Sequence, residues 1–146
     1  MGTATTTQGS MVLLTRLAQE VFRRSTEDVL GITLKQYMLL RNLRDHEGAQ
    51  PQQTLCGSMH MDPNYLVLLL NDVEEAGLVE RRRDPDDRRR HIVELTPAGQ
   101  ASLERAEAGM QAVEDEVLSD LSAQERVELG RMLSKALAKT GSNGSG

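Results

Sequence analysis

The feature that most constrains the fold of this chain is a short basic segment between residues 81 and 95. Two clusters of arginine enclose the sequence Asp84-Pro85-Asp86-Asp87, and aspartate and proline are residues that initiate tight turns. Short runs with strand-forming residues flank the turn at residues 78–82 and 91–95. The pattern predicts an antiparallel hairpin of two strands whose tip is rich in arginine.

A helix with distinct start and stop signals precedes this hairpin. Asp62 followed by Pro63 is typical of an N-cap with proline at the first helical position, and Gly77 ends the helix. Apolar residues spaced i, i+3, i+4 and i+7 give this helix one buried face: Leu66, Leu69, Leu70 and Val73. The helical repeat then places these residues on the opposite face and its flanks: Asn64, Tyr65, Val67, Leu68, Asn71 and Glu75.

Further helices are predicted on both sides of this unit. One spans residues 10–30 and ends at Gly31, and a second begins at the capping box of Thr33 and Gln36 and continues to Gly48. A turn at residues 48–51 leads to a short helix around Leu55, Cys56 and Met59. After the hairpin, Thr96-Pro97 begins a long helix, and Ser122 with Glu125 begins the last one.

These elements predict a mostly α-helical protein with a small β wing, of the winged helix-turn-helix class. Residues 10–139 form one domain, in which residues 33–99 are the winged lobe, and residues 1–9 and 140–146 are expected to be disordered tails. The helices at residues 10–30 and 100–139 carry apolar stripes that one small domain cannot cover. We therefore expect these helices to pair two copies of the chain as a homodimer.

The charge of the chain is unevenly distributed. The net charge of −5 argues against a nucleic-acid partner for the chain as a whole, because phosphates require cations at the contact surface. Arginines nevertheless occupy all of residues 81–83 and 88–90, whereas acidic residues gather between positions 104 and 128. A basic tip on an acidic body predicts local contact with DNA, because a narrow minor groove attracts guanidinium groups.

Other classes of protein are disfavoured by what the sequence lacks. Cys56 is the only cysteine, which rules out an intrachain disulfide and a multi-cysteine zinc cage. The three histidines, His46, His60 and His91, do not share a metal-binding spacing, so neither a metal nor another cofactor is expected. A Gly-rich phosphate loop, a nucleophile elbow and a His-Glu-x-x-His motif are missing, which disfavours an enzyme. The lack of a leader or long apolar run predicts a cytoplasmic protein away from membranes.

The motifs resemble those of the multiple antibiotic resistance regulator (MarR) family of bacterial transcription factors. The likeness rests on Asp62-Pro63, on residues 70–79 ending in Gly77-Leu78-Val79, and on residues 84–89 leading into residues 93–99. It implies a dimer that binds a near-palindromic operator of double-stranded DNA. Each subunit would place one recognition helix in the major groove and one wing in the minor groove.

The resemblance and the helical face together predict a set of DNA-contacting residues: Asn64, Tyr65, Val67, Leu68, Asn71, Asp87, Arg88, Arg89 and Arg90. Asp87 and Arg89 take the family's paired acid-and-arginine positions in the wing. Val67 and Leu68 stand where the family often has threonine and arginine, so base readout rests more on Asn64, on contact with thymine methyl groups and on the wing. His60 stands where the family often has a glycine of positive φ, which histidine tolerates better than most residues.

The resemblance also implies a repressor that a small aromatic acid or phenol releases from DNA. Arg16, Tyr37 and Met38 are the predicted effector-binding residues, with Arg16 as the cation for an acidic ligand; ordinary packing or surface roles remain open for all three. Two other functions also remain open. The exposed Val67 and Leu68 suit a winged-helix module that binds proteins, and Cys56 suits a redox-responsive regulator, although its position favours packing.

Overall fold

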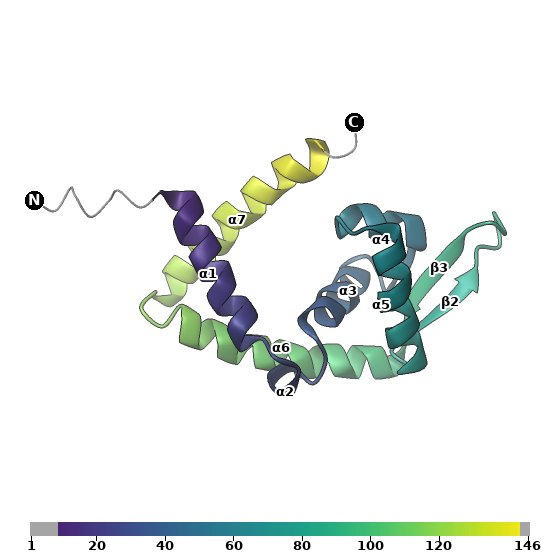
Figure 1. Cartoon of the computed structure of the whole chain (residues 1–146), viewed down its shortest axis with the longest axis horizontal. Helices are drawn as coiled ribbons and strands as arrows, with labels where there is room; N and C mark the ends of the chain where they lie inside the picture. Colours follow the sequence, from purple (N-terminus) through teal and green to yellow (C-terminus); the bar gives the residue numbers. More distant parts are fainter. Residues whose placement is uncertain (1–8, 144–146) are drawn as a thin grey trace, which may run out of the picture.

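The structure, a computed structural model, describes residues 9–143 and consists of helices with one small antiparallel sheet (Figure 1). Its elements in chain order are α1 Ser10–Arg24, α2 Glu27–Leu30, α3 Leu34–Asp45, β1 Ala49–Pro51, α4 Gln52–Ser58, α5 Pro63–Glu75, β2 Val79–Arg83, β3 His91–Leu95, α6 Pro97–Val117 and α7 Ala123–Asn143. The long helix α6 runs from a lobe that holds α3 to β3 to a region where α7 begins beside α1 (Figure 1). From there α7 extends back toward the lobe, where Leu137 lines a groove with Met38 and Met59. This is a winged helix fold, as the sequence predicts.

The N-terminal region differs from the prediction, because the single helix expected at residues 10–30 is two helices. Ser25 leaves helical geometry at the end of α1, Thr26 caps α2, and Gly31 closes α2 with a φ of 83°. The break lets α2 turn onto α6, where a Cβ on Gly109 would lie only 2.5 Å from the Val29 carbonyl oxygen. The spacing of apolar residues within 10–30 could not reveal this break, because the break accompanies a contact between α2 and α6, which are far apart in the sequence.

The turn expected at residues 48–51 contains a third strand. β1 pairs antiparallel with β3, Gln50 opposite Val93, and the sheet order is β1-β3-β2. The strand is short and lies at the sheet edge, where Pro51 is tolerated because an edge position needs no further ladder donor. The two strands predicted for the hairpin are present as β2 and β3, with Arg81 opposite Val93.

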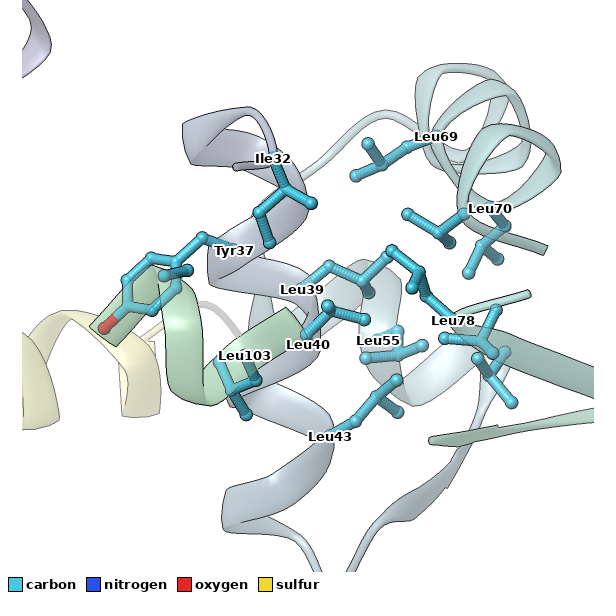
Figure 2. Packing of buried hydrophobic residues seen from close by; sticks show 14 of the residues in the cluster. Ile32, Tyr37, Leu39, Leu40, Leu43, Leu55, Leu69, Leu70, Leu78 and Leu103 are labelled. Carbon is cyan, nitrogen blue, oxygen red and sulfur yellow. The ribbon is translucent and has the colours of Figure 1, made fainter. Parts of the chain in front are cut away.

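The core lies inside the lobe and includes the predicted inner face of α5. Leu66, Leu70 and Val73 are fully buried and Leu69 is nearly so. They belong to one cluster with leucines of α3, α4 and α6, and Figure 2 labels these leucines: Leu39, Leu40, Leu43, Leu55 and Leu103. Because α5 is held by its apolar face, its opposite face is fixed toward solvent.

The predicted helix caps are present. The backbone N–H of Gln36 donates to Thr33 Oγ1 at 3.2 Å and that of Thr33 to Gln36 Oε1 at 3.1 Å. Ser122 and Glu125 form the same reciprocal pair at the start of α7. α7 continues to Asn143, so residues 140–143, expected to be disordered, are helical. The rest of the expected tails, residues 1–8 and 144–146, lies outside the described residues.

Thr96 joins the start of α6 to the end of α5. Its hydroxyl accepts from the Gly99 N–H at 3.0 Å and donates to the Gly77 carbonyl at 2.6 Å. Gly99 is required there, because a Cβ would collide with the carbonyl oxygen of Leu78. The end of α5, the start of β2 and the start of α6 therefore meet at one tightly packed corner.

Candidate nucleic-acid interface

The outer face of α5 is positioned by its N-cap and its buried leucines. The carboxylate of Asp62 accepts the Asn64 backbone N–H at 3.0 Å, which fixes the first turn. Asn64, Asn71 and Glu75 are exposed, and so are Tyr65, Val67 and Leu68. All five residues predicted on α5 to contact DNA thus lie on its solvent side. His60, in the turn that leads into α5, has a positive φ of 51° as expected.

Arg81 connects the wing to α5, a contact that the sequence analysis did not predict. Its Nη2 donates to Glu74 Oε1 at 2.8 Å and to Asn71 Oδ1 at 2.6 Å. These hydrogen bonds hold the pKa of the Glu74 carboxyl below its ordinary value, chiefly through the Arg81 side chain and then through its backbone N–H. Arg81 therefore links the helix to the hairpin, and it also binds Asn71, one of the predicted DNA-contacting residues.

The tip of the wing is organised by its own aspartates. Asp84 Oδ1 accepts the Asp86 N–H at 2.9 Å, and Asp87 Oδ1 accepts the Arg89 N–H at 3.1 Å, which are local bonds typical of Asx turns. Asp87 also forms the predicted ion pair with Arg89, whose Nε lies 3.3 Å away. An exposed pair of this kind contributes about 0–1 kcal/mol, so its role is to orient the arginine.

The other wing arginines differ in their availability. Arg82 pairs with Glu94 across the hairpin at 3.6 Å, and Arg83 donates to the Arg88 carbonyl at 2.7 Å. Arg88 is exposed, and the side chain of Arg89 is 92% exposed. Arg90 is half-buried. The tip thus presents two outward cations, at Arg88 and Arg89, on a tightly bonded turn.

A small cavity of about 340 Å³ lies between the base of the wing and the start of α5. Arg89 and Arg90 line it from the wing, and Pro63 and Val67 line it from the helix. The structure therefore brings the two predicted groups of DNA-contacting residues side by side on one surface. Figure 1 shows α5 beside the hairpin, with the turn extending beyond it.

The predicted effector residues do not come together in one chain. Tyr37 is buried and lines a cavity of about 410 Å³ between α1, α3, α6 and α7. Met38 is half exposed and lines a separate groove beside α4, and Arg16 lies beside Leu13 and Gln19 on α1. A residue that the sequence analysis missed, Arg41, shares the Tyr37 cavity, and its Nη1 donates to the Tyr37 hydroxyl at 3.0 Å. The spacing of four residues on α3 was the available signal.

Next to this cavity, an ion pair joins the lobe to α6. Arg44 Nη1 and Nη2 donate to the two carboxylate oxygens of Glu107 at 2.6 and 2.9 Å. These bonds are the main reason that the pKa of Glu107 lies below its ordinary value, against the opposing effect of burial. Glu107 also lines the cavity. The ion pair that joins α3 to α6 is therefore part of the cavity wall.

Cys56 lies half-buried on α4 and packs against the leucine core. Within residues 9–143, no cluster of three histidine, cysteine or carboxylate side chains could hold a metal ion. No helix in that same range has the length and apolar character required to cross a lipid bilayer.

Comparisons with known proteins give the chain a family. The family model described as the MarR family matches residues 32–91. A putative transcriptional regulatory protein for the hcr operon of Thauera aromatica is 31% identical over 114 residues, which cover 78% of this chain and 68% of the relative. The HTH-type transcriptional repressor Rv2887 of Mycobacterium tuberculosis is 33% identical over 106 residues, covering 73% of this chain and 76% of that protein.

Solved structures show the same fold. A probable transcriptional regulator from Pseudomonas aeruginosa has a TM-score of 0.74 and 29% identity, covering 88% of this chain and 97% of its own. A mutant MarR of Escherichia coli complexed with operator DNA has a TM-score of 0.72 and 28% identity, covering 86% and 91%. An organohalide-sensing regulator in a form bound to 2,4-dichlorophenol matches at 20% identity, with a TM-score of 0.72 and coverage of 90% and 79%, and shares the fold.

The winged lobe, its arginine-tipped hairpin and these likenesses define a transcriptional regulator built on a winged helix. The chain belongs to the MarR family.

Proposed function

We propose that this regulator is a homodimeric repressor that binds a near-palindromic operator, with α5 in the major groove and the β2–β3 wing in the minor groove. One observation carries the proposal: Arg81 ties the wing to α5, while Arg89 projects from the tip with 92% of its side chain exposed. A helix and a wing that are held together rigidly, with cations facing solvent, suit DNA binding, because the cations displace the counterions of the phosphates. The likeness to a MarR bound to operator DNA supports this placement.

The flanking helices support pairing of two copies. α1 buries none of its side chains in its own chain, and neither does α7 over residues 123–139. The large apolar side chains that these two helices expose are Met11, Val12, Leu13, Leu14, Phe22, Val127, Met132 and Leu137. Because monomers rarely leave such a set in water, the same helices of a second copy are the natural cover.

Release by a small ligand is the second half of the proposal, and the 410 Å³ cavity is its site. Apolar side chains from α1, α6 and α7, among them Leu17, Val113 and Leu133, line most of this cavity, and its polar lining consists of Tyr37, Arg41, Glu107, Gln111 and Glu114. An aromatic ring fits this lining, and Arg41, in place of Arg16, is the cation for an acidic group, because Glu107 and Glu114 are already paired with Arg44 and Arg126. The related fold bound to 2,4-dichlorophenol supports a ligand of this size.

The proposal is tested by measuring Kd for the duplex DNA that flanks the gene of this protein, at several salt concentrations. We expect one dimer per site and a Kd that rises steeply with salt, and we expect salicylate or 2,4-dichlorophenol to weaken binding. A monomer by sedimentation at the binding concentration, or an affinity independent of salt, would contradict the proposal. Phe22→Glu, which places a charge on the exposed apolar face of α1, should yield monomers with reduced affinity.

A further inference from the structure

The recognition helix of this chain lacks the cations that usually approach DNA. Residues 63–75 contain neither lysine nor arginine, and they include three acidic residues: Asp72, Glu74 and Glu75. Attraction to the phosphates must therefore come from outside α5, and the wing provides it through Arg88 and Arg89. The helix itself is left to discriminate between bases.

Only one of its two asparagines is placed to read a base edge. The side-chain oxygen of Asn71 is 2.6 Å from Arg81 Nη2, and Arg81 is itself held by Glu74. Bidentate pairing with adenine needs both the oxygen and the nitrogen of the amide, so Asn71 would have to give up this bond. Asn64 lies exposed in the first turn, at the end of the helix that enters the groove first.

Apart from the two asparagines and Glu75, the outer face is apolar. Leu68 is 62% exposed, and it lies one helical turn from both Asn64 and Asn71, at the centre of the face. Tyr65 and Val67 flank it with 47% and 38% exposure. In the major groove, the one apolar group that a base pair presents is the C5-methyl of thymine.

We propose that α5 selects its operator chiefly through thymine methyl groups, with Leu68 as the central specificity-determining residue and Val67 and Tyr65 beside it. The inference rests on the proposed function, since it presumes that α5 lies in the major groove. Arg89 and Arg90 of the wing line one cavity with Val67 of this face, and these cations favour DNA as its occupant over a protein.

The test begins with duplexes that the full-length protein selects from a random pool. In the best duplex, each thymine of a half-site is replaced in turn by deoxyuridine, which keeps the base pair and the O4 acceptor and removes only the methyl. We expect affinity to fall roughly fourfold for each methyl that the helix buries, the value of one methyl-sized transfer. The loss should be confined to the thymines that face α5.

The Leu68→Ala variant then tests whether Leu68 is the residue that contacts the thymine methyl group. This variant should bind the thymine and deoxyuridine duplexes equally at the central position, while the wild-type chain distinguishes them. Val29→Ala is the matched control, because Val29 is another exposed aliphatic residue but lies on α2, against α6. It should keep the wild-type discrimination, and circular dichroism should show both variants folded.

Failure of the inference and failure of the proposed function are distinguishable. Salt-dependent binding with equal affinity for thymine and deoxyuridine at every position would overturn methyl reading and leave DNA binding intact. Discrimination that persists in Leu68→Ala would overturn the assignment to Leu68. A pool that shows no enrichment at any salt concentration would overturn both and would assign the apolar face of α5 to a protein partner.

Discussion

The guanidinium of Arg81 lies against the carboxylate of Glu74, with Nε and Nη2 at 3.2 and 2.8 Å from one oxygen and the Arg81 backbone N–H at 3.1 Å from the other. Arg81 belongs to β2 and Glu74 to the last turn of α5. The first arginine of the basic run thus fixes the angle between the wing and α5, while Arg88 and Arg89, at the other end of the run, are exposed.

Glu74→Gln should weaken DNA binding although it removes a negative charge near the DNA. The charge change alone would raise affinity, so a lower affinity must come from the lost position of the wing. Glu75→Gln, the neighbouring exposed residue, reports the charge effect by itself and should bind as well as the wild-type chain or better. Stability, measured by urea unfolding, should fall by up to about 1 kcal/mol in Glu74→Gln. Equal affinities for the two variants would contradict the positioning role.

Arg89→Ala should weaken binding to every duplex alike and reduce the salt dependence of log Kd by about one unit per subunit, as expected for one lost phosphate contact. Its folding should be unchanged, because the side chain is almost wholly exposed. Arg131→Ala removes the same charge from an exposed position on α7 and is the control. An Arg89→Ala protein with wild-type affinity at matched salt would refute the contact between wing and DNA.

Asn64→Ala should cost about 1–3 kcal/mol of binding free energy at one or two base pairs of each half-site and little elsewhere. Binding to a panel of single-base operator variants measures this pattern. Asn71→Ala is the comparison, because the side-chain oxygen of Asn71 is bound by Arg81. This variant should lose less affinity than Asn64→Ala, and the loss should be similar for every duplex of the panel. If Asn64→Ala lost affinity evenly instead, Asn64 would be a phosphate contact.

Glu107→Gln should make stability less dependent on pH. The pKa of Glu107 is lowered in the folded protein from an ordinary value of 4.5, mainly by Arg44. The stabilisation is therefore complete above about pH 5 and is lost as the pH falls through the folded pKa. Between about pH 5 and 3, the free energy of unfolding should decline less in Glu107→Gln than in the wild-type chain. Glu104→Gln, one turn earlier on α6 and exposed, should follow the wild-type curve.

Gly109→Ala should destabilise the fold by about 1–3 kcal/mol, because the new methyl group would meet the Val29 carbonyl and push α2 from α6. Alanine normally stabilises a helix relative to glycine by about 1 kcal/mol. Gly130→Ala on α7 is the control and should be stabilising, because a Cβ at this position would meet no atom of the described residues within 4 Å. Thermal melts of the two variants should shift in opposite directions, and a stabilised Gly109→Ala would contradict the packing of α2.

Features specified by neighbouring residues were predictable from the sequence. The caps at Thr33, Asp62 and Ser122, the buried face of α5 and the aspartate turn of the wing depend on residues a few positions apart, and each is present in the structure. The missed features depend on distant partners. The strand at Ala49–Pro51 exists because β3 lies beside it.

In the candidate site, too, the locally specified features were the predictable ones. The outward set on α5 followed from the helical repeat, whereas the roles of Arg81 and Arg41 did not. Arg81 belongs to a run of arginines that looks uniform in the sequence, and only the packing of β2 on α5 separates it from Arg89. The predicted effector set placed residues together that the fold holds on different surfaces, because a linear pattern carries no information on which helices enclose a cavity.

The helix α6 is an unbroken rod of 21 residues, about 31 Å long, with the corner of Thr96 and Gly99 at one end and the flanking helices at the other. A rod of that length acts as a lever: a tilt of about 5° at one end displaces the other by roughly 3 Å, close to the rise of one base pair. In the proposed dimer, a small molecule that shifts α6 slightly would carry the two wings out of phase with the DNA helix without unfolding any part of the protein.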